Sequence, residues 1–167
     1  MLKNFPGVLK TSEVIPYLNL PSSKNGNVNV WDLKQRKNLV IFFYHGAYCP
    51  HCAEKLQEIA DAYQRFEELE AEVFAISFDK LPKLRTLAER IGIPFPLLQD
   101  ETGETTTTFT FIDPADNVPY PTILITDRFG VLRYQEMVSE AHELPDVEEM
   151  LSWLLLIQTE CPECSPL

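Results

Sequence analysis

One stretch of the sequence passes from an apolar strand through two cysteines into a helix. Residues 38–44 form a nearly continuous apolar run, which is typical of a strand buried inside a sheet. The run is followed by Cys49-Pro50-His51-Cys52, and Pro50 suits the first helical turn because its missing N–H would be unpaired there. Apolar residues then recur at helical spacings of three and four: Leu56, Ile59, Ala60, Tyr63 and Phe66. We therefore expect the cysteines at a strand-to-helix junction.

Such a junction favours a reactive thiolate. The first turn of a helix has unpaired backbone N–H groups and carries the positive end of the helix dipole, so negative charge on Cys49 is stabilised there. The thiolate is the form of cysteine that attacks other atoms. A protonated His51 would add a second positive charge beside it. The motif therefore predicts thiol–disulfide chemistry at Cys49 and Cys52.

Composition predicts one globular domain without a basic surface. The 167 residues are 45% hydrophobic, which is enough for a core, and we assign residues 1–160 to the domain and 161–167 to a tail. Asp and Glu outnumber Lys and Arg by 25 to 14, and the net charge of −11 argues against nucleic acid or anionic membranes as partners. The first ten residues lack the apolar segment of a secretory signal, and no apolar run has membrane-spanning length, so we expect a cytoplasmic protein.

The four cysteines form two Cys-x-x-Cys pairs, and the second pair is Cys161 and Cys164 in the tail. A structural disulfide framework would spread its cysteines around the fold, so this pattern indicates redox or metal chemistry. The tail pair fits an electron shuttle to Cys49 and Cys52, half of a zinc site, or a tail without a specific role. We expect no cofactor beyond the redox-active disulfide, with zinc at the tail pair as the less favoured alternative.

Strand and helix signals alternate along the chain, which predicts an α/β sandwich around one sheet. A Thr-rich run over 105–110 fits either a helix or a strand. The other expected elements are a hairpin over 17–20 and 28–31, strands over 38–44 and 72–78, helices over 50–70 and 79–91 (capped by Asp79 and ended by Gly92), an extended piece over 94–98, strands over 123–126 and 131–137, and a final helix over 144–158.

This order resembles the thioredoxin superfamily, and more narrowly the redoxin group that contains the AhpC/TSA peroxiredoxins. The resemblance covers roughly residues 8–157 and rests on three motifs, at residues 42–52, 120–122 and 126–130. It implies a three-layer α/β/α thioredoxin-like fold with an N-terminal β-hairpin and a βα insertion. It also implies that Pro121, preceded by Tyr120, is a cis proline lying against the two cysteines.

The resemblance favours a thiol–disulfide oxidoreductase. Cys49 would form a mixed disulfide with a protein or small-molecule partner, and Cys52 would resolve it. The Pro50-His51 pair matches that of bacterial Dsb-type oxidases, in which the histidine stabilises the thiolate. Tyr48 stands where thioredoxins carry tryptophan and would shape the target groove. An electron donor is also implied, but its identity is not.

A peroxidase of the AhpC/TSA type is the alternative, with Cys49 attacking a hydroperoxide and Cys52 condensing with the sulfenic acid. Peroxiredoxins supply a Thr or Ser three residues before the nucleophile and an Arg from a later strand. This sequence has Gly46 and Pro121 at those places, which favours disulfide exchange. A redox-inert binding module is the third class, and it is disfavoured because such modules usually lose an active-site cysteine.

One further departure concerns proton transfer. Thioredoxins place a buried acid six residues before the first cysteine, and this chain has Phe43 there. His45 lies close in sequence and is a candidate to exchange a proton with Cys52. The other interpretation of His45 is a hydrogen-bonded structural residue in the loop.

Overall fold

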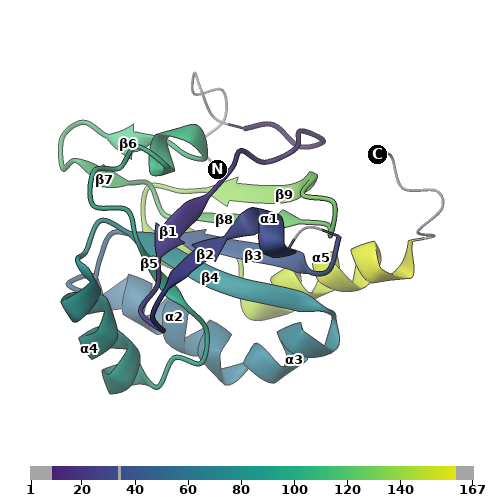
Figure 1. The fold of residues 1–167 in the computed structure, drawn as a ribbon, viewed down its shortest axis with the longest axis horizontal. Coiled ribbons are helices and arrows are strands. Elements are labelled where there is room, and N and C mark those ends of the chain that lie inside the picture. Colours follow the sequence, from purple (N-terminus) through teal and green to yellow (C-terminus); the bar gives the residue numbers. More distant parts are fainter. Residues whose placement is uncertain (1–8, 34, 161–167) are drawn as a thin grey trace.

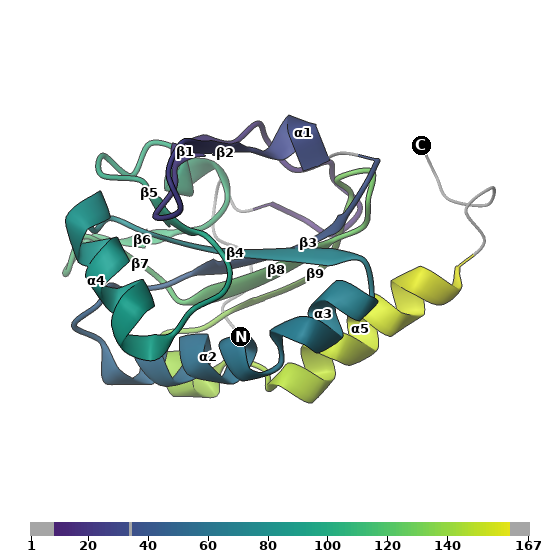
Figure 2. The ribbon, with the colours of Figure 1, turned by 60° about the horizontal axis from the view of Figure 1, so that its bottom comes forward.

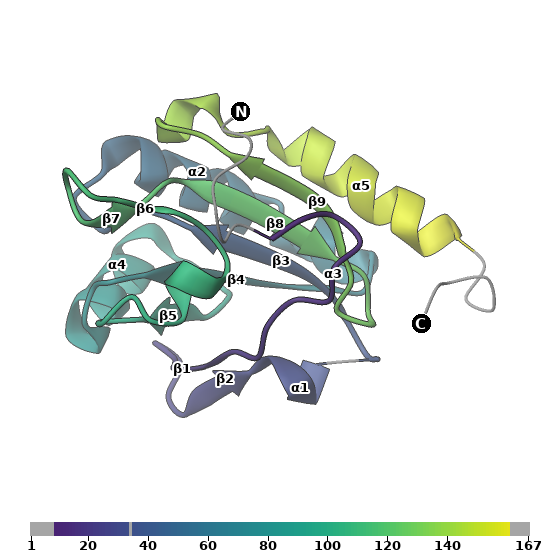
Figure 3. The ribbon, with the colours of Figure 1, turned by 90° about the horizontal axis from the view of Figure 1, so that it is seen from above.

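A five-stranded mixed sheet forms the centre of the molecule (Figures 1 and 3). The computed structural model describes residues 9–33 and 35–160. The strand order is β5-β4-β3-β8-β9, with β3, β4 and β5 parallel and β8 and β9 each antiparallel to the preceding neighbour. The strands are β3 (Asn38–Phe43), β4 (Ala71–Ser77), β5 (Leu97–Gln99), β8 (Thr122–Thr126) and β9 (Leu132–Met137). All six residues of β3 are buried, as its continuous apolar sequence predicts.

Figure 2 shows α2, α3 and α5 along one face of this sheet, with α4 at the side of β5. Alternate residues of β3 point to this face, including Val40 and Phe42, and pack with the helices into one apolar cluster. These helices are α2 (Pro50–Asp61), α3 (Tyr63–Glu68), α4 (Leu81–Ile91) and α5 (Val147–Thr159).

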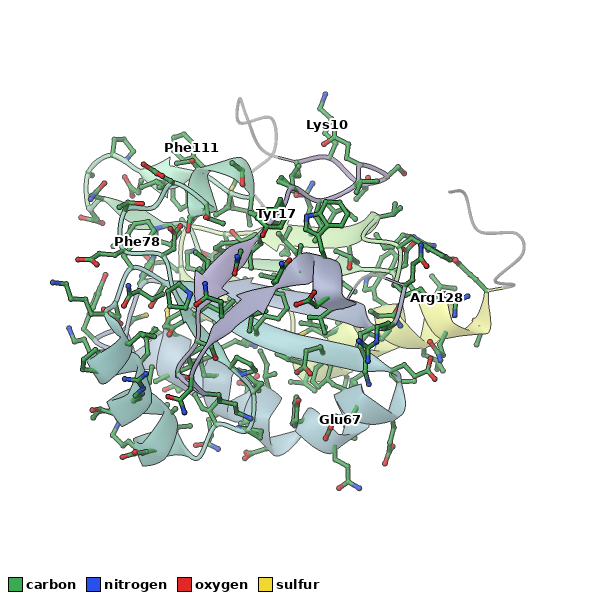
Figure 4. The ribbon with its side chains drawn as sticks, in the orientation of Figure 1. Lys10, Tyr17, Glu67, Phe78, Phe111 and Arg128 are labelled. Carbon is green, nitrogen blue, oxygen red and sulfur yellow. The ribbon has the colours of Figure 1, made fainter. Side chains whose placement is uncertain are left out.

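The opposite face of the sheet is covered by shorter elements, which form a second apolar cluster with Leu39, Ile41 and Phe43. Tyr17 lies on the outside of this layer (Figure 4), where its ring stacks on Trp31 at 6.2 Å. The layer contains β1 (Asn19–Pro21), β2 (Asn27–Asn29), α1 (Val30–Leu33) and the 3-10 turn η1 (Thr106–Thr108). The α/β fold class predicted from the sequence is therefore confirmed.

The long helix expected over 50–70 is two helices, because the chain leaves the helical path at Ala62. The Ala62 N–H reaches back to Ile59 as well as Ala60, which is the tighter pattern of a 3-10 turn. The change of direction buries Phe66 completely. It also lets the Tyr63 hydroxyl donate to Glu72 of β4 at 2.8 Å.

Three short elements have no clear signal in the sequence. They are the hairpin strands β6 (Ile112–Asp113) and β7 (Val118–Pro119) and the 3-10 turn η2 (Ala141–Glu143). The Thr-rich run, which fitted a helix or a strand, contains the turn η1. Within residues 9–33 and 35–160, no helix is both long and apolar enough to cross a membrane. Cys161 and Cys164 lie outside the described residues, so the division into a domain and a tail stays a prediction.

Candidate active site

The two cysteines of the first pair lie where the central strand ends. β3 finishes at Phe43 between the ends of β4 and β8, and a short loop leads from it into α2. Figure 4 marks this end of the sheet by Phe78 and Phe111, whereas Arg128 marks the opposite end. The end of β3, where this loop begins, is therefore paired with a strand on each side.

Cys49 is the N-cap residue of α2. Its backbone is extended (φ −87°, ψ 111°), and its Sγ accepts a hydrogen bond from the Cys52 N–H at 3.3 Å. This contact stabilises negative charge on the sulfur, as does the dipole of the 12-residue helix. Cys49 is partly exposed and carries a free thiol, so an external substrate can reach it.

Cys52 lies one turn further along and is completely buried. Burial raises the pKa of its thiol strongly, the adjacent Cys49 raises it further, and backbone groups of His45 and Gly46 offset part of the effect. Cys52 is therefore a protonated thiol near neutral pH in the reduced protein. The partly exposed sulfur of Cys49 is accessible to a substrate, whereas the buried thiol of Cys52 is not. This arrangement suits Cys49 as a nucleophile and Cys52 as a resolving thiol.

His45 lies beside both sulfurs. A ring nitrogen of His45 and the two Sγ atoms all lie within 4.8 Å of one another. Burial lowers the pKa of this imidazole, and the carboxylates of Glu140, Asp116 and Asp113 oppose that effect. The ring is therefore neutral near neutral pH, so its free nitrogen lone pair can accept a proton from a thiol, as a weaker base than an ordinary imidazole.

Asp79 fixes the loop from the end of β4. Its Oδ2 accepts a hydrogen bond from the Ala47 N–H at 2.7 Å. The prediction that Asp79 caps α4 is wrong, because its carboxylate is used here and Lys80 is the N-cap residue. Gly46 is needed at the turn: it has φ +151°, and a Cβ there would lie 2.9 Å from Cε1 of Tyr48 and 3.2 Å from Oδ2 of Asp79.

The other residues of the motif line the surface around Cys49. Pro50 occupies the start of α2 as predicted. His51 is exposed, its Nδ1 lies 3.3 Å from Oε2 of Glu54, and its ring centroid lies 5.2 Å from that of His142. Tyr48 is 63% exposed. A hollow runs from Tyr48 to α4 and is lined by Ala47, Tyr48, Lys83, Thr86, Leu87 and Arg90.

A comparison with known families matches residues 11–135 to the AhpC/TSA family. The chain belongs to the AhpC/TSA family. Peroxiredoxin bcp1 of Schizosaccharomyces pombe is 29% identical over 96 residues, which are 58% of this chain and 49% of the relative. Peroxiredoxin Bcp of Escherichia coli K12 is 31% identical over 93 residues, which are 56% and 59% of the two chains. The matched part thus spans about half to three-fifths of these relatives.

Solved structures support the same fold. Peroxidoxin BcpB of Mycobacterium tuberculosis has a TM-score of 0.78 at 22% identity, covering 89% of this chain and 98% of that one. AhpC of Enterococcus faecalis has a TM-score of 0.80 at 22% identity, covering 91% and 98%. These likenesses confirm the thioredoxin-like arrangement expected from the sequence.

In this AhpC/TSA chain the expectation that Pro121 is cis is wrong. No cis peptide bond occurs among the described residues. The chain stays extended into β8: the Tyr120 N–H donates to Phe111 at 3.0 Å, and the Pro121 carbonyl accepts from Val138 at 3.0 Å. The trans isomer is the favoured form of an X-Pro bond, and this extended path accommodates it. Pro121 is still next to the site, because the following Thr122 pairs with Phe43.

The ring of Tyr120 stacks on that of Phe111, with the two ring centroids 5.6 Å apart. Tyr44, which ends the apolar run that contains β3, is a neighbour of the site that the sequence alone does not identify. It is completely buried, and Cys52 and Ser77 are among the groups that affect its titration. Its hydroxyl makes no hydrogen bond of normal geometry within the described part of the chain. Burial raises the pKa of this phenol, so it stays protonated.

The lowered pKa of His45 predicts how stability depends on pH. In the unfolded chain this imidazole titrates near its ordinary value of about 6.5, and in the folded chain it binds its proton only at lower pH. Between the two values the unfolded state holds more protons, so the free energy of unfolding falls as the pH falls through this window. We expect His45→Gln to lose less stability than the wild type between about pH 7 and pH 5 in urea titrations. Equal losses would contradict the assignment.

Proposed function

We propose that this chain is a thiol-dependent peroxidase of the peroxiredoxin type, in which Cys49 reduces a hydroperoxide. The observation that carries the proposal is the placement of Cys49. Its partly exposed sulfur caps α2, accepts the Cys52 N–H at 3.3 Å, and belongs to a chain of the AhpC/TSA family. Peroxiredoxins among its relatives support the same activity.

The first step is a displacement at oxygen. The Cys49 thiolate attacks one peroxide oxygen, the O–O bond breaks, and the leaving oxygen takes a proton to become water or an alcohol. Cys49 is then a sulfenic acid, which holds the oxidising equivalents of the peroxide. In the first turn of α2 Pro50 has no N–H, and the Cys52 and Ala53 N–H groups donate to the sulfur and the carbonyl of Cys49. The His51 N–H is the first-turn group that can donate a hydrogen bond to a reacting oxygen.

The second step closes a disulfide. The Cys52 sulfur attacks the Cys49 sulfenic acid, an S–S bond forms, and water leaves. Cys52 must lose its proton in this step, and the neutral ring of His45 lies within 4.8 Å of its sulfur, where it can accept the proton and pass it to the departing hydroxide, which leaves as water. An external dithiol then reduces the Cys49–Cys52 disulfide and restores both thiols.

Disulfide exchange without peroxide is the second candidate function, and two observations favour it. Gly46 and Pro121 offer no side-chain donor to a peroxide oxygen at the places where peroxiredoxins carry Thr or Ser and Arg. In addition, the exposed ring of Tyr48 and the hollow beside it provide a surface next to Cys49 for a larger substrate. In this reaction Cys49 would form a mixed disulfide with the substrate and Cys52 would resolve it.

One pair of assays separates the two functions. The pre-reduced protein is mixed with hydrogen peroxide or with a protein disulfide such as insulin, and thiol loss is followed at the same pH. We expect peroxide to oxidise Cys49 at least about 100-fold faster than it oxidises free cysteine, because a positioned site lowers the barrier by this order. Oxidation by peroxide at the rate of free cysteine, together with rapid insulin reduction, would establish disulfide exchange instead.

A further inference from the structure

We propose that His45, Cys49 and Cys52 of the reduced protein form a zinc-binding site. The three ligand atoms come from the loop after β3 and from the start of α2, and all lie within 4.8 Å of one another. Two thiolates and one imidazole are ligands that zinc prefers. This proposal concerns the reduced dithiol itself and does not depend on which substrate oxidises it.

The separation of the ligand atoms suits zinc after a small adjustment. Zinc binds sulfur at about 2.3 Å and nitrogen at about 2.0–2.1 Å, so in a tetrahedral site the two sulfurs lie about 3.8 Å apart and each sulfur lies about 3.6 Å from the nitrogen. Ligand atoms within 4.8 Å of one another therefore have to approach by about 1.2 Å at most. Cys49 can supply this movement by rotating about χ1, because it is partly exposed and contributes its side chain from the N-cap position.

The charges in the site also balance. Two thiolates and a neutral imidazole cancel the charge of Zn²⁺, so the complex does not bury a net charge beside the completely buried Cys52. Cys49 faces partly towards solvent, which gives the ion access and leaves a fourth position for water. His51 is nearby in sequence but belongs to a different group, since it is exposed and pairs with Glu54 at 3.3 Å.

Zinc binding at this site would be controlled by the redox state. When peroxide oxidises the pair, two electrons leave the sulfurs as the S–S bond forms, and the peroxide takes these electrons and two protons. The zinc ion keeps its charge but loses both thiolate ligands, so it is released. Conversely, zinc bound to both sulfurs shields them from oxidation and alkylation.

The test is a zinc competition titration against a chromophoric chelator. The reduced 167-residue chain carries Cys161→Ser and Cys164→Ser (the tail-pair variant), so that zinc cannot bind the tail pair. We expect one zinc ion per chain, no binding after oxidation to the disulfide, and an affinity at least about 10-fold weaker in His45→Gln. His51→Gln is the matched control and is expected to bind as tightly as the tail-pair variant itself. No zinc binding by the tail-pair variant, or equal affinity in this variant with and without His45→Gln, would overturn the proposal.

Cobalt(II) provides a second readout, which does not require any variant at His45 to fold. A tetrahedral site with two thiolates gives Co²⁺ an intense sulfur-to-metal absorption band, which should appear in the tail-pair variant and lose at least about half of its intensity in its Cys52→Ser form, where one thiolate remains. Circular dichroism of each protein shows whether the fold is intact. A cobalt complex of the tail-pair variant without the sulfur band would also overturn the proposed site.

Discussion

Replacing Cys49 with serine is expected to abolish turnover of both hydroperoxides and disulfides. Serine at this position can still cap α2 through its Oγ, so the fold should be kept while the nucleophile is lost. Cys52→Ser should leave the first step intact but stop the cycle, because the oxidised Cys49 or its mixed disulfide is no longer resolved. We expect the steady-state rate to fall by at least about 1,000-fold in Cys49→Ser, as for removal of other activated nucleophiles.

The measurement combines steady-state rates with intact-protein mass. A Cys52→Ser chain that has reacted once should carry a single adduct on Cys49, and unfolding in urea should show that both variants are folded. Turnover of Cys52→Ser at the wild-type rate would contradict the role of Cys52 as the resolving thiol. Repeating the experiment with Cys161 and Cys164 also replaced by serine would then show whether the tail pair resolves the adduct.

Phe42→Ala is expected to lower the free energy of unfolding by about 3–5 kcal/mol, because it removes a large side chain and leaves a cavity. Phe42 is completely buried in the central strand β3, and its ring lies 5.4 Å from that of Tyr44. Neighbouring strands on both sides restrict collapse around the cavity. Urea denaturation followed by circular dichroism gives the change directly.

Tyr17→Ala is the matched control for an aromatic ring outside the core. Tyr17 is 52% exposed and stacks on Trp31 in the layer formed by the hairpin and α1. We expect its loss to cost about 1 kcal/mol or less. A cost for Phe42→Ala that is no larger than this would mean that β3 is not at the centre of the folded core.

The sequence predicts elements well wherever one local signal decides them. The nearly continuous apolar run predicts β3. Cys49-Pro50 and the helical spacing of the apolar residues that follow predict the start of α2. Gly92 ends α4 in the left-handed conformation (φ +79°), as its position after an amphipathic helix predicts.

Contacts between distant segments explain the failures. Aspartate is a common N-cap residue, but the carboxylate of Asp79 instead accepts a hydrogen bond from the N–H of Ala47, 32 positions earlier in the chain. The break at Ala62 reflects packing of Phe66 and Tyr63 against the core and β4, which no local pattern encodes. In the sequence, His45 is a candidate only because it lies four positions before Cys49. Its position beside both sulfurs depends on the conformation of the loop between β3 and α2.

The complete burial of Cys52 has a consequence for the direction of exchange. In the reduced protein Cys52 is completely buried and Cys49 is partly exposed, so we expect an incoming thiolate to bond to Cys49 of the disulfide and to expel Cys52. A thiol whose pKa is raised is a slow leaving group. Reopening the disulfide is therefore expected to be the slow half of each cycle. The steady-state turnover rate would then depend on the concentration of the reducing thiol rather than on the concentration of the oxidant.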